Sequence, residues 1–175
     1  MVRRAVVTGA PGSGKSTLLA EVARRGIVTR PEVARAILQT PGGMELRAQK
    51  PAQFAVAMLE AQLAAWGDGE VGQGPLLYDR GFPDIVGFLK LEGLAVPSQI
   101  DAACRNCRFE GPVFHTRPWK GIYRQDAERV QSWDEAVASD EAVVQAWRDY
   151  GYDLTPLPFT DPAARARFVL AKLGV

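Results

Sequence analysis

The chain has 175 residues, 47% of them hydrophobic, which is enough apolar material for one domain, residues 1–175, whose core needs no disulfide. The formal net charge of +1 lacks the basic excess typical of nucleic-acid-binding proteins, so no nucleic-acid partner is expected. No apolar stretch approaches the ~18 residues of a membrane span, and the short apolar start does not resemble a signal peptide, so the expected location is cytoplasmic.

Apolar runs and helical patterns alternate along the chain. Short apolar runs predict strands at residues 2–8, 26–30, 75–81, 111–118 and 152–159. Apolar residues at helical spacing predict helices at 16–24, from Pro31 onward, and at 51–66, 84–91, 98–107, 132–150 and 161–173. The stretch from Thr40 to Pro51 predicts a loop, because its prolines and glycines interrupt regular structure. This alternation indicates an α/β fold: a parallel sheet with helices on both faces, whose strand ends bind ligands.

The first predicted strand leads directly into a phosphate-binding motif. Gly9, Gly14, Lys15 and Ser16 match the pattern G-x-x-x-x-G-K-[ST], which arises by chance in fewer than ~1% of chains of this length. Its glycines let backbone N–H groups face phosphates, Lys15 adds a positive charge for catalysis, and the Ser16 hydroxyl can ligate Mg²⁺. We therefore expect a P-loop that binds ATP and Mg²⁺. The expected nucleotide-binding residues are Gly9, Ala10, Pro11, Gly12, Ser13, Gly14, Lys15, Ser16 and Thr17.

Missing motifs exclude several classes of P-loop protein. A Ras-like GTPase reads guanine with N-K-x-D, but the one asparagine of this chain is Asn106, in the sequence RNCR. The LSGGQ signature of transporter ATPases is absent as well. The third strand ends in Asp-Arg, whereas a hexameric motor requires Asp-Glu there. The residues that follow the strands therefore have to indicate the chemistry.

Asp79 and Arg80 stand at the end of the predicted third strand. At that position Asp79 can hold Mg²⁺ or its water shell, and the Arg80 guanidinium can bridge to a transferring phosphoryl group. The alternative is an ordinary surface salt bridge. The apolar run before the pair and the glycine after it favour the functional interpretation.

Glu32 follows the predicted second strand, in the sequence TRPEVAR. Its carboxylate faces the same edge of the sheet as Asp79 and can accept a proton from a substrate hydroxyl. The alternative is electrostatic, because glutamate is favoured in the first turn of any helix. A catalytic Glu32 has to open into the same cleft as Lys15 and Arg80.

A cluster of cations follows the predicted fourth strand. Arg117, Lys120, Arg124 and Arg129 suit a lid over phosphates, at about residues 117–131, with Arg124 and Arg129 as candidate catalytic residues. Arg124 and Arg129 are five positions apart, about 140° on a helix, so one face does not hold both. A solvated helix with internal ion pairs is the alternative.

The two cysteines, Cys104 and Cys107, form the sequence CRNC. A zinc site needs four ligands, and a second cysteine pair is absent from the sequence. Inert, reduced thiols are therefore expected, with half a zinc site or a redox pair as the alternative.

Four stretches together resemble one family: VVTGAPGSGKSTLL, PEVAR, YDRGFPDIVGFL and PWKGIYRQDAERVQSWDEA. They are similar to the small P-loop AAA-domain ATPase/kinase family related to the ribosylnicotinamide kinase domain. The resemblance implies a kinase-like P-loop fold, a five-stranded parallel sheet with the first strand central, and ATP-Mg²⁺ binding. Deoxynucleoside and nucleotide kinases are more distant relatives. They imply Glu32 as base, Asp79 near Mg²⁺ and Arg80 on the phosphoryl group.

Two functions are consistent with these residues. The first is transfer of the γ-phosphoryl group of ATP to a hydroxyl of a nucleoside-like or other small metabolite. The second is a regulatory ATPase or GTPase switch that acts through a protein partner. The acceptor cleft is expected between the segment Thr40–Pro51, the helix bearing Phe54 and Met58, and the residues after Asp79. Phe159 either packs on adenine or merely precedes a helix capped by Thr160 or Asp161.

Overall fold

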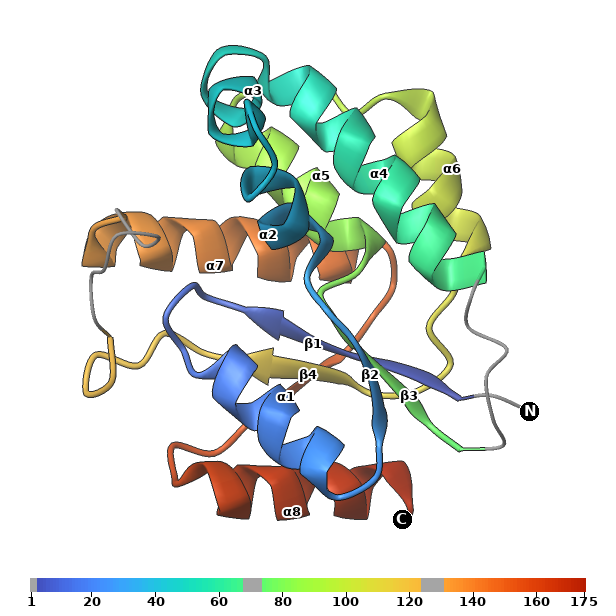
Figure 1. Cartoon of the computed structure of the whole chain (residues 1–175), viewed down its shortest axis with the longest axis vertical. Helices are drawn as coiled ribbons and strands as arrows, with labels where there is room; N and C mark the ends of the chain where they lie inside the picture. Colours follow the sequence, from blue (N-terminus) through green and yellow to red (C-terminus); the bar gives the residue numbers. More distant parts are fainter. Residues whose placement is uncertain (1–2, 68–73, 124–130) are drawn as a thin grey trace.

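The computed structural model describes residues 3–67, 74–123 and 131–175. Its sheet has five parallel strands in the order β2-β3-β1-β4-β5 (Figure 1). The strands are β1 (Arg4–Gly9), β2 (Val28–Arg30), β3 (Leu76–Asp79), β4 (Val113–Thr116) and β5 (Leu154–Pro156). The expected parallel five-stranded sheet with the first strand in the centre is thereby confirmed.

Helices cover both faces of this sheet. Their bounds are α1 (Lys15–Arg24), α2 (Val33–Leu38), α3 (Gly43–Gln49), α4 (Pro51–Gly67), α5 (Phe82–Leu91), α6 (Ser98–Asn106), α7 (Trp133–Asp149) and α8 (Pro162–Leu173). Figure 1 shows α1 and α8 on one face and α4 to α7 on the other. In β1, Ala5 and Val7 pack toward α1 and α8, whereas Val6 packs toward the opposite layer. Burial on both faces explains why the central strands β1, β3 and β4 read as apolar runs, whereas the edge strands β2 and β5 are less buried.

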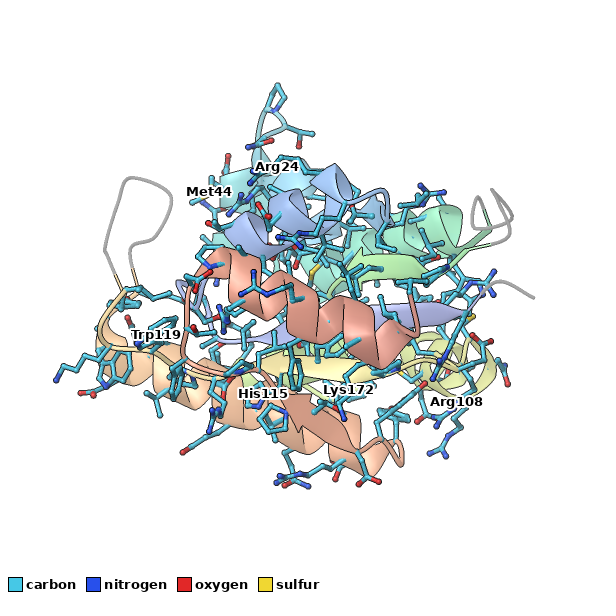
Figure 2. All side chains as sticks on the ribbon, turned by 90° about the horizontal axis from the view of Figure 1, so that it is seen from below. Arg24, Met44, Arg108, His115, Trp119 and Lys172 are labelled. Carbon is cyan, nitrogen blue, oxygen red and sulfur yellow. The ribbon has the colours of Figure 1, made fainter. Side chains whose placement is uncertain are left out.

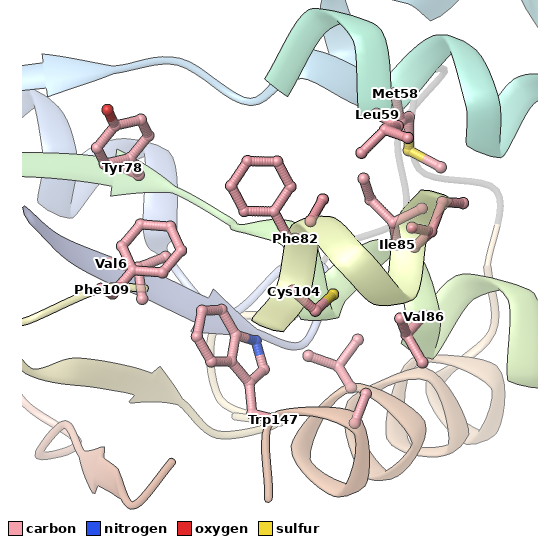
Figure 3. Close-up of a cluster of buried hydrophobic side chains, with 14 of the residues drawn as sticks. Val6, Met58, Leu59, Tyr78, Phe82, Ile85, Val86, Cys104, Phe109 and Trp147 are labelled. Atoms are coloured by element: carbon pink, nitrogen blue, oxygen red, sulfur yellow. The ribbon is translucent and has the colours of Figure 1, made fainter. Parts of the chain in front are cut away.

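Aromatic side chains fill the core between the sheet and the layer of α4 to α7 (Figure 3). The Phe109 ring lies 5.4 Å from that of Tyr78 and 5.6 Å from that of Trp147, centroid to centroid. A Cβ at Gly81 would lie 2.8 Å from Phe109, so only glycine lets the start of α5 approach this core so closely. The segment after β3 is therefore held directly against the core.

Three predicted boundaries were wrong. The expected loop Thr40–Pro51 contains α3, because its residues after Gly43 are good helix formers and only the residues before them turn. A Cβ at Gly43 would lie 2.0 Å from the Ile37 carbonyl oxygen, so this glycine permits close packing of α2 and α3. Helix α2 begins at Val33, because the backbone at Glu32 is still extended, and α5 begins at Phe82, two residues before the predicted start.

Within the described ranges, no helix is both long and apolar enough to cross a bilayer. The segment predicted as a lid, 117–131, is described only up to Tyr123 and again from Gln131. Arg124 and Arg129 lie outside the described residues.

Candidate active site

A cavity of about 920 Å³ lies where the chain leaves β1, β2 and β3. This volume is near the upper end of the range of about 300–1,000 Å³ for small-molecule sites. Lys15, Glu32 and Arg80 all line it, as expected from the sequence. Met44 and Trp119 line it as well, and Figure 2 shows both toward the same end of the molecule, opposite Arg108.

The P-loop contributes one wall of the cavity. Gly12 and Gly14 have φ angles of 71° and 85°, which turn the backbone tightly between β1 and α1. Of the predicted nucleotide-binding residues, six line the cavity: Pro11, Gly12, Gly14, Lys15, Ser16 and Thr17. The remaining three, Gly9, Ala10 and Ser13, are not among the described residues that line it. They build the loop from behind.

Thr116, at the end of β4, fixes the back of the P-loop. Its hydroxyl donates to the Thr8 carbonyl oxygen at 3.1 Å and accepts from the Ser13 hydroxyl at 2.7 Å. A Cβ at Gly9 would lie 2.3 Å from the Thr116 carbonyl oxygen, so this position requires glycine. The sequence did not indicate this role, because it depends on the pairing of β1 with β4.

Lys15 is buried, and its Nζ donates to the Ala10 carbonyl oxygen at 2.8 Å. Burial, and after it the nearby Arg80, lower the pKa of the Lys15 ammonium to about 8, against the opposing effect of the surrounding carboxylates. The Lys15 charge is therefore desolvated and bonded to backbone. Such a charge is well placed to interact with phosphate oxygens.

Arg80 lies between two carboxylates. Its Nε donates to Glu32 Oε1 at 3.1 Å, and its Nη1 donates to Asp84 Oδ1 at 2.9 Å. Its φ of 68° is in the left-handed region, which costs a non-glycine residue about 1–2 kcal/mol. The two ion pairs hold this unfavourable backbone in place, and such strain is concentrated at functional sites. Burial lowers the pKa of the Arg80 guanidinium, but the carboxylates raise it above its ordinary value.

Asp84 connects the site to the core. Besides Arg80, it accepts from the Thr8 hydroxyl at 2.5 Å, the Gly81 N–H at 2.9 Å and the Trp147 indole N–H at 3.0 Å. Asp84 lines the cavity and is 7% exposed. Its role was not predicted from the sequence. The available signal was the second acidic residue of DRGFPD, four residues after Arg80 on the first turn of α5.

Glu32 precedes the first turn of α2 and forms no capping hydrogen bond with it. Burial raises the pKa of its carboxyl, but Arg80, Lys15 and Arg35 outweigh burial and leave the pKa below the ordinary value. The carboxyl is therefore ionised at neutral pH. A preference for the start of a helix does not account for a carboxylate that bonds to Arg80.

Asp79 is 7% exposed, and its Oδ1 has no hydrogen-bond partner among the described residues. Burial raises the pKa of Asp79 to about 6, against the opposing effect of Lys15. Asp79 is not among the described residues that line the cavity, whereas Ser16 is exposed there. A buried carboxylate oxygen without a partner and a free hydroxyl are oxygen donors that suit Mg²⁺.

Arg165, on α8, is a second site residue that the sequence analysis missed. Its Nη1 donates to the Ser13 carbonyl oxygen at 2.9 Å, and its Nε donates to the Pro158 carbonyl oxygen at 3.0 Å. Arg165 lies under the Trp119 ring, 5.5 Å from its centroid, and both residues line the cavity. Arg165 therefore holds the P-loop at Ser13, the residue that Thr116 also contacts.

The remaining predicted features are resolved as follows. Asp161 caps α8 by accepting from the Ala164 N–H at 2.9 Å. Phe159 is 48% exposed and packs on Trp119, at 5.2 Å between ring centroids, and on Arg117. The pocket wall at this end is formed by the residues that follow it: Thr160, Asp161 and Pro162.

Within the described ranges, no three His, Cys, Asp or Glu side chains are grouped to hold a metal ion. Cys104 and Cys107 are both free, and burial raises the pKa of the Cys104 thiol to about 12. A thiol that stays protonated is neither a good ligand nor a good nucleophile.

The segments predicted to wall an acceptor cleft contribute residues to this cavity. Met44 and Arg47 from α3, Phe54 and Met58 from α4, and Ile85 and Phe88 from α5 all line the cavity. Helix α7 contributes Ser139 and Val143, which the sequence analysis did not anticipate.

Solved structures resemble this chain throughout its length. A deoxyadenosine kinase from M. mycoides with bound dATP superposes with a TM-score of 0.73 at 15% identity, covering 98% of this chain and 100% of the other. A NadR protein in complex with NR gives a TM-score of 0.75 at 16% identity, covering 99% of this chain but only 52% of NadR. At these identities the likeness establishes the shared fold, that of a kinase-like P-loop protein.

Comparison of the sequence with curated proteins gave no match. A family model described as an AAA domain matches residues 4–165, from the start of β1 into α8. Because this match includes most of the chain, the protein belongs to the AAA domain family.

Proposed function

We propose that this protein is an ATP- and Mg²⁺-dependent phosphotransferase that moves the γ-phosphoryl group of ATP to a hydroxyl of a small acceptor. One observation carries the proposal: a P-loop lysine, an ionised carboxylate and an arginine paired to that carboxylate line the same cavity. The cavity volume of about 920 Å³ accommodates a nucleotide and a second small molecule.

The P-loop side binds the donor in this proposal. Backbone N–H groups of the loop and the start of α1 contact the phosphates, and Lys15 reaches their outer oxygens. Ser16 and Asp79 hold Mg²⁺, which neutralises phosphate charge when bound. Asp79 supplies its unpartnered Oδ1 for this purpose.

Glu32 and Arg80 act on the acceptor. The acceptor oxygen forms a bond to the γ-phosphorus, the bond from that phosphorus to the β–γ bridging oxygen breaks, and ADP leaves. The hydroxyl proton passes to Glu32. Because the pKa of Glu32 lies below its ordinary value, the proton moves as the new bond forms, not before. Arg80 stabilises charge on the transferring group.

The similar structures support the assignment of the nucleotide. The similar structures include a deoxyadenosine kinase with bound dATP and a NadR protein with NAD and AMP-PNP. Arg124 and Arg129 remain candidates for additional contacts to the transferring group, on the sequence pattern alone. The acceptor in this proposal is a small alcohol of the nucleoside-like size range.

The test is phosphoryl transfer by Glu32→Gln. This substitution keeps the shape of the side chain and its contact with Arg80, but removes the group that accepts the proton. With the best acceptor from a panel of nucleosides and other small alcohols, the rate of ADP formation is expected to fall by ~10²–10⁴-fold. ATP-Mg²⁺ binding, measured by calorimetry, stays within about threefold of the wild type.

Glu45→Gln is the matched control, because Glu45 is an exposed glutamate on α3. It is expected to leave the rate unchanged. A wild type that hydrolyses ATP slowly, and at the same rate with every acceptor, would contradict the transferase and favour a regulatory switch instead.

A further inference from the structure

One part of the cavity differs sharply from the P-loop wall. It is lined by α2, α3, α4, α5 and α7, and we call it the acceptor compartment. Large apolar side chains dominate it, among them Leu38, Met44, Phe54, Met58, Phe88 and Leu91. Met44 and Leu91 are 57% and 42% exposed, so the apolar lining continues to the molecular surface. Exposed apolar side chains at a cavity mark a surface that an apolar ligand covers.

This compartment contains more positively charged than negatively charged side chains. Its two carboxylates, Glu32 and Asp84, both form ion pairs with Arg80, at 3.1 and 2.9 Å. Two further arginines, Arg35 and Arg47, line the cavity and form no ion pair within the described residues. The compartment therefore carries positive charge that its own carboxylates do not neutralise.

Arg47 places this charge beside the apolar wall. Its guanidinium carbon lies 5.9 Å from the centroid of the Phe88 ring, and Phe88 packs edge-on against Phe54 at 5.4 Å. Arg47 is partly buried, whereas Lys50, at the end of the same helix, is exposed. A cation on an aromatic wall suits a ligand that presents an anionic group next to an apolar body.

We infer that the acceptor is an amphiphilic alcohol: an apolar body that carries a hydroxyl and an anionic group, the latter a carboxylate or a phosphate. This inference rests on the proposed phosphotransferase function. The hydroxyl lies at Glu32, the apolar body packs on Phe54, Met58 and Phe88, and Arg47 pairs with the anion. A neutral nucleoside matches this lining poorly, because it carries no anion and its hydroxyls need polar partners.

The first experiment measures binding without turnover. Calorimetry in the presence of Mg²⁺ and AMP-PNP compares four probes: a medium-chain ω-hydroxy carboxylic acid, its methyl ester, an ω-hydroxyalkyl phosphate of the same length, and deoxyadenosine. At least one of the two anions is expected to bind ~10-fold or more tightly than the ester and deoxyadenosine. The tighter of the two anions identifies the group.

Variants at Arg47 test the assigned contact. Arg47→Gln is expected to weaken binding of the preferred anion ~10-fold, to the level of the ester, and to leave the ester unaffected. Arg47→Lys retains most of the preference, because it retains the charge. Lys50→Gln is the matched control and binds all probes as the wild type does. Thermal melts of each variant establish that the fold is retained.

The inference is overturned by equal binding of the anions and the ester, by tighter binding of deoxyadenosine, or by an unchanged preference in Arg47→Gln. Measuring ADP formation from ATP with each probe tests the proposed function separately from this inference. An anion that binds through Arg47 but does not stimulate ADP formation supports the assigned ligand contact and contradicts the kinase. Stimulation of ADP formation by deoxyadenosine and not by the anions supports the kinase and contradicts the acceptor assignment.

Discussion

The two walls of the cavity are built by different means. The P-loop wall consists of consecutive residues, and its backbone provides most of the groups that suit phosphate. The acceptor compartment is assembled from side chains of five helices that lie in three separate parts of the sequence, residues 33–67, 82–91 and 133–149. Phosphate is common to every nucleotide, so one short motif recognises it. An acceptor is particular to one enzyme, and its recognition needs side chains that the fold brings together.

The two walls also differ in how their charges are satisfied. Lys15 and Asp79 are buried on the P-loop side, and in both cases burial disfavours the charged form. On the acceptor side, Glu32 and Asp84 are each bonded to Arg80. The P-loop side therefore carries an electrostatic penalty that a bound nucleotide and cation would relieve, whereas the two carboxylates on the acceptor side are already paired with Arg80. Substitutions on the two sides should consequently have opposite effects on stability.

The largest expected effect is on nucleotide binding by Lys15→Ala. Lys15 contacts backbone carbonyls and has a desolvated charge, so its removal does not lower the melting temperature measured without nucleotide. The thermal shift induced by ATP-Mg²⁺ is expected to disappear, because the shift scales with the logarithm of ligand concentration over Kd.

Lys172→Ala removes an exposed lysine on α8 and serves as the control, with the full thermal shift expected. A Lys15→Ala protein that still responds to ATP-Mg²⁺ would refute the role of the P-loop. A large loss of stability without nucleotide would instead show that Lys15 stabilises the fold, so that the two walls would not differ in this respect.

The next largest effect is on stability, and it tests the paired carboxylates of the acceptor wall. Asp84→Asn removes the charge that pairs with Arg80 while it keeps the size of the side chain. Breaking a buried ion pair costs about 3–5 kcal/mol, so the free energy of unfolding should fall by about that amount in urea titration. Turnover falls as well, since Arg80 loses one of the two contacts that hold its left-handed backbone.

Thr8→Val sharpens this result, because it removes only the hydroxyl donor to Asp84 and nearly keeps the size of the side chain. An unsatisfied acceptor costs about 1–3 kcal/mol, so the loss of stability is smaller than in Asp84→Asn. Asp153→Asn, at an exposed aspartate before β5, should unfold like the wild type. Equal stability of Asp84→Asn and the wild type would show that the acceptor wall is not compensated by this ion pair.

The smallest effect is the contribution of Asp79 to the pH dependence of the free energy of unfolding. Its pKa of about 6 in the folded protein lies above the ordinary value of 3.8, so protonated Asp79 favours the fold. This stabilisation is fully present below pH ~4 and is lost as the pH rises through about 6, a loss of roughly 3 kcal/mol. Asp79→Asn, which does not titrate, lacks this loss.

The measurement is the difference in free energy of unfolding between Asp79→Asn and the wild type, without nucleotide, from pH 4 to pH 7. The other carboxylates titrate in both proteins and cancel. The difference should grow in favour of Asp79→Asn as the pH rises. A difference that is constant across this range would mean that Asp79 is not penalised by burial.

The sequence alone determined the sheet and the P-loop. Apolar runs flanked by turn-forming residues predicted all five strands. The P-loop was predictable because its residues are consecutive and because its glycines allow the tight backbone turn needed at that point. The strand-end rule also placed Glu32 and Arg80 at one edge of the sheet. Only the parallel pairing of β2 with β3 determined that their side chains meet.

Tertiary structure decided everything that depends on distant partners. Asp84 bonds to Thr8, 76 positions away; Thr116 bonds to Ser13, 103 away; and Arg165 bonds to Ser13, 152 away. No local pattern encodes such contacts, because each residue alone is an ordinary member of its helix or strand. Helix α3 was missed for a related reason, since Gly43 at its start serves close packing against α2. The acceptor compartment likewise exists only once five helices are packed together.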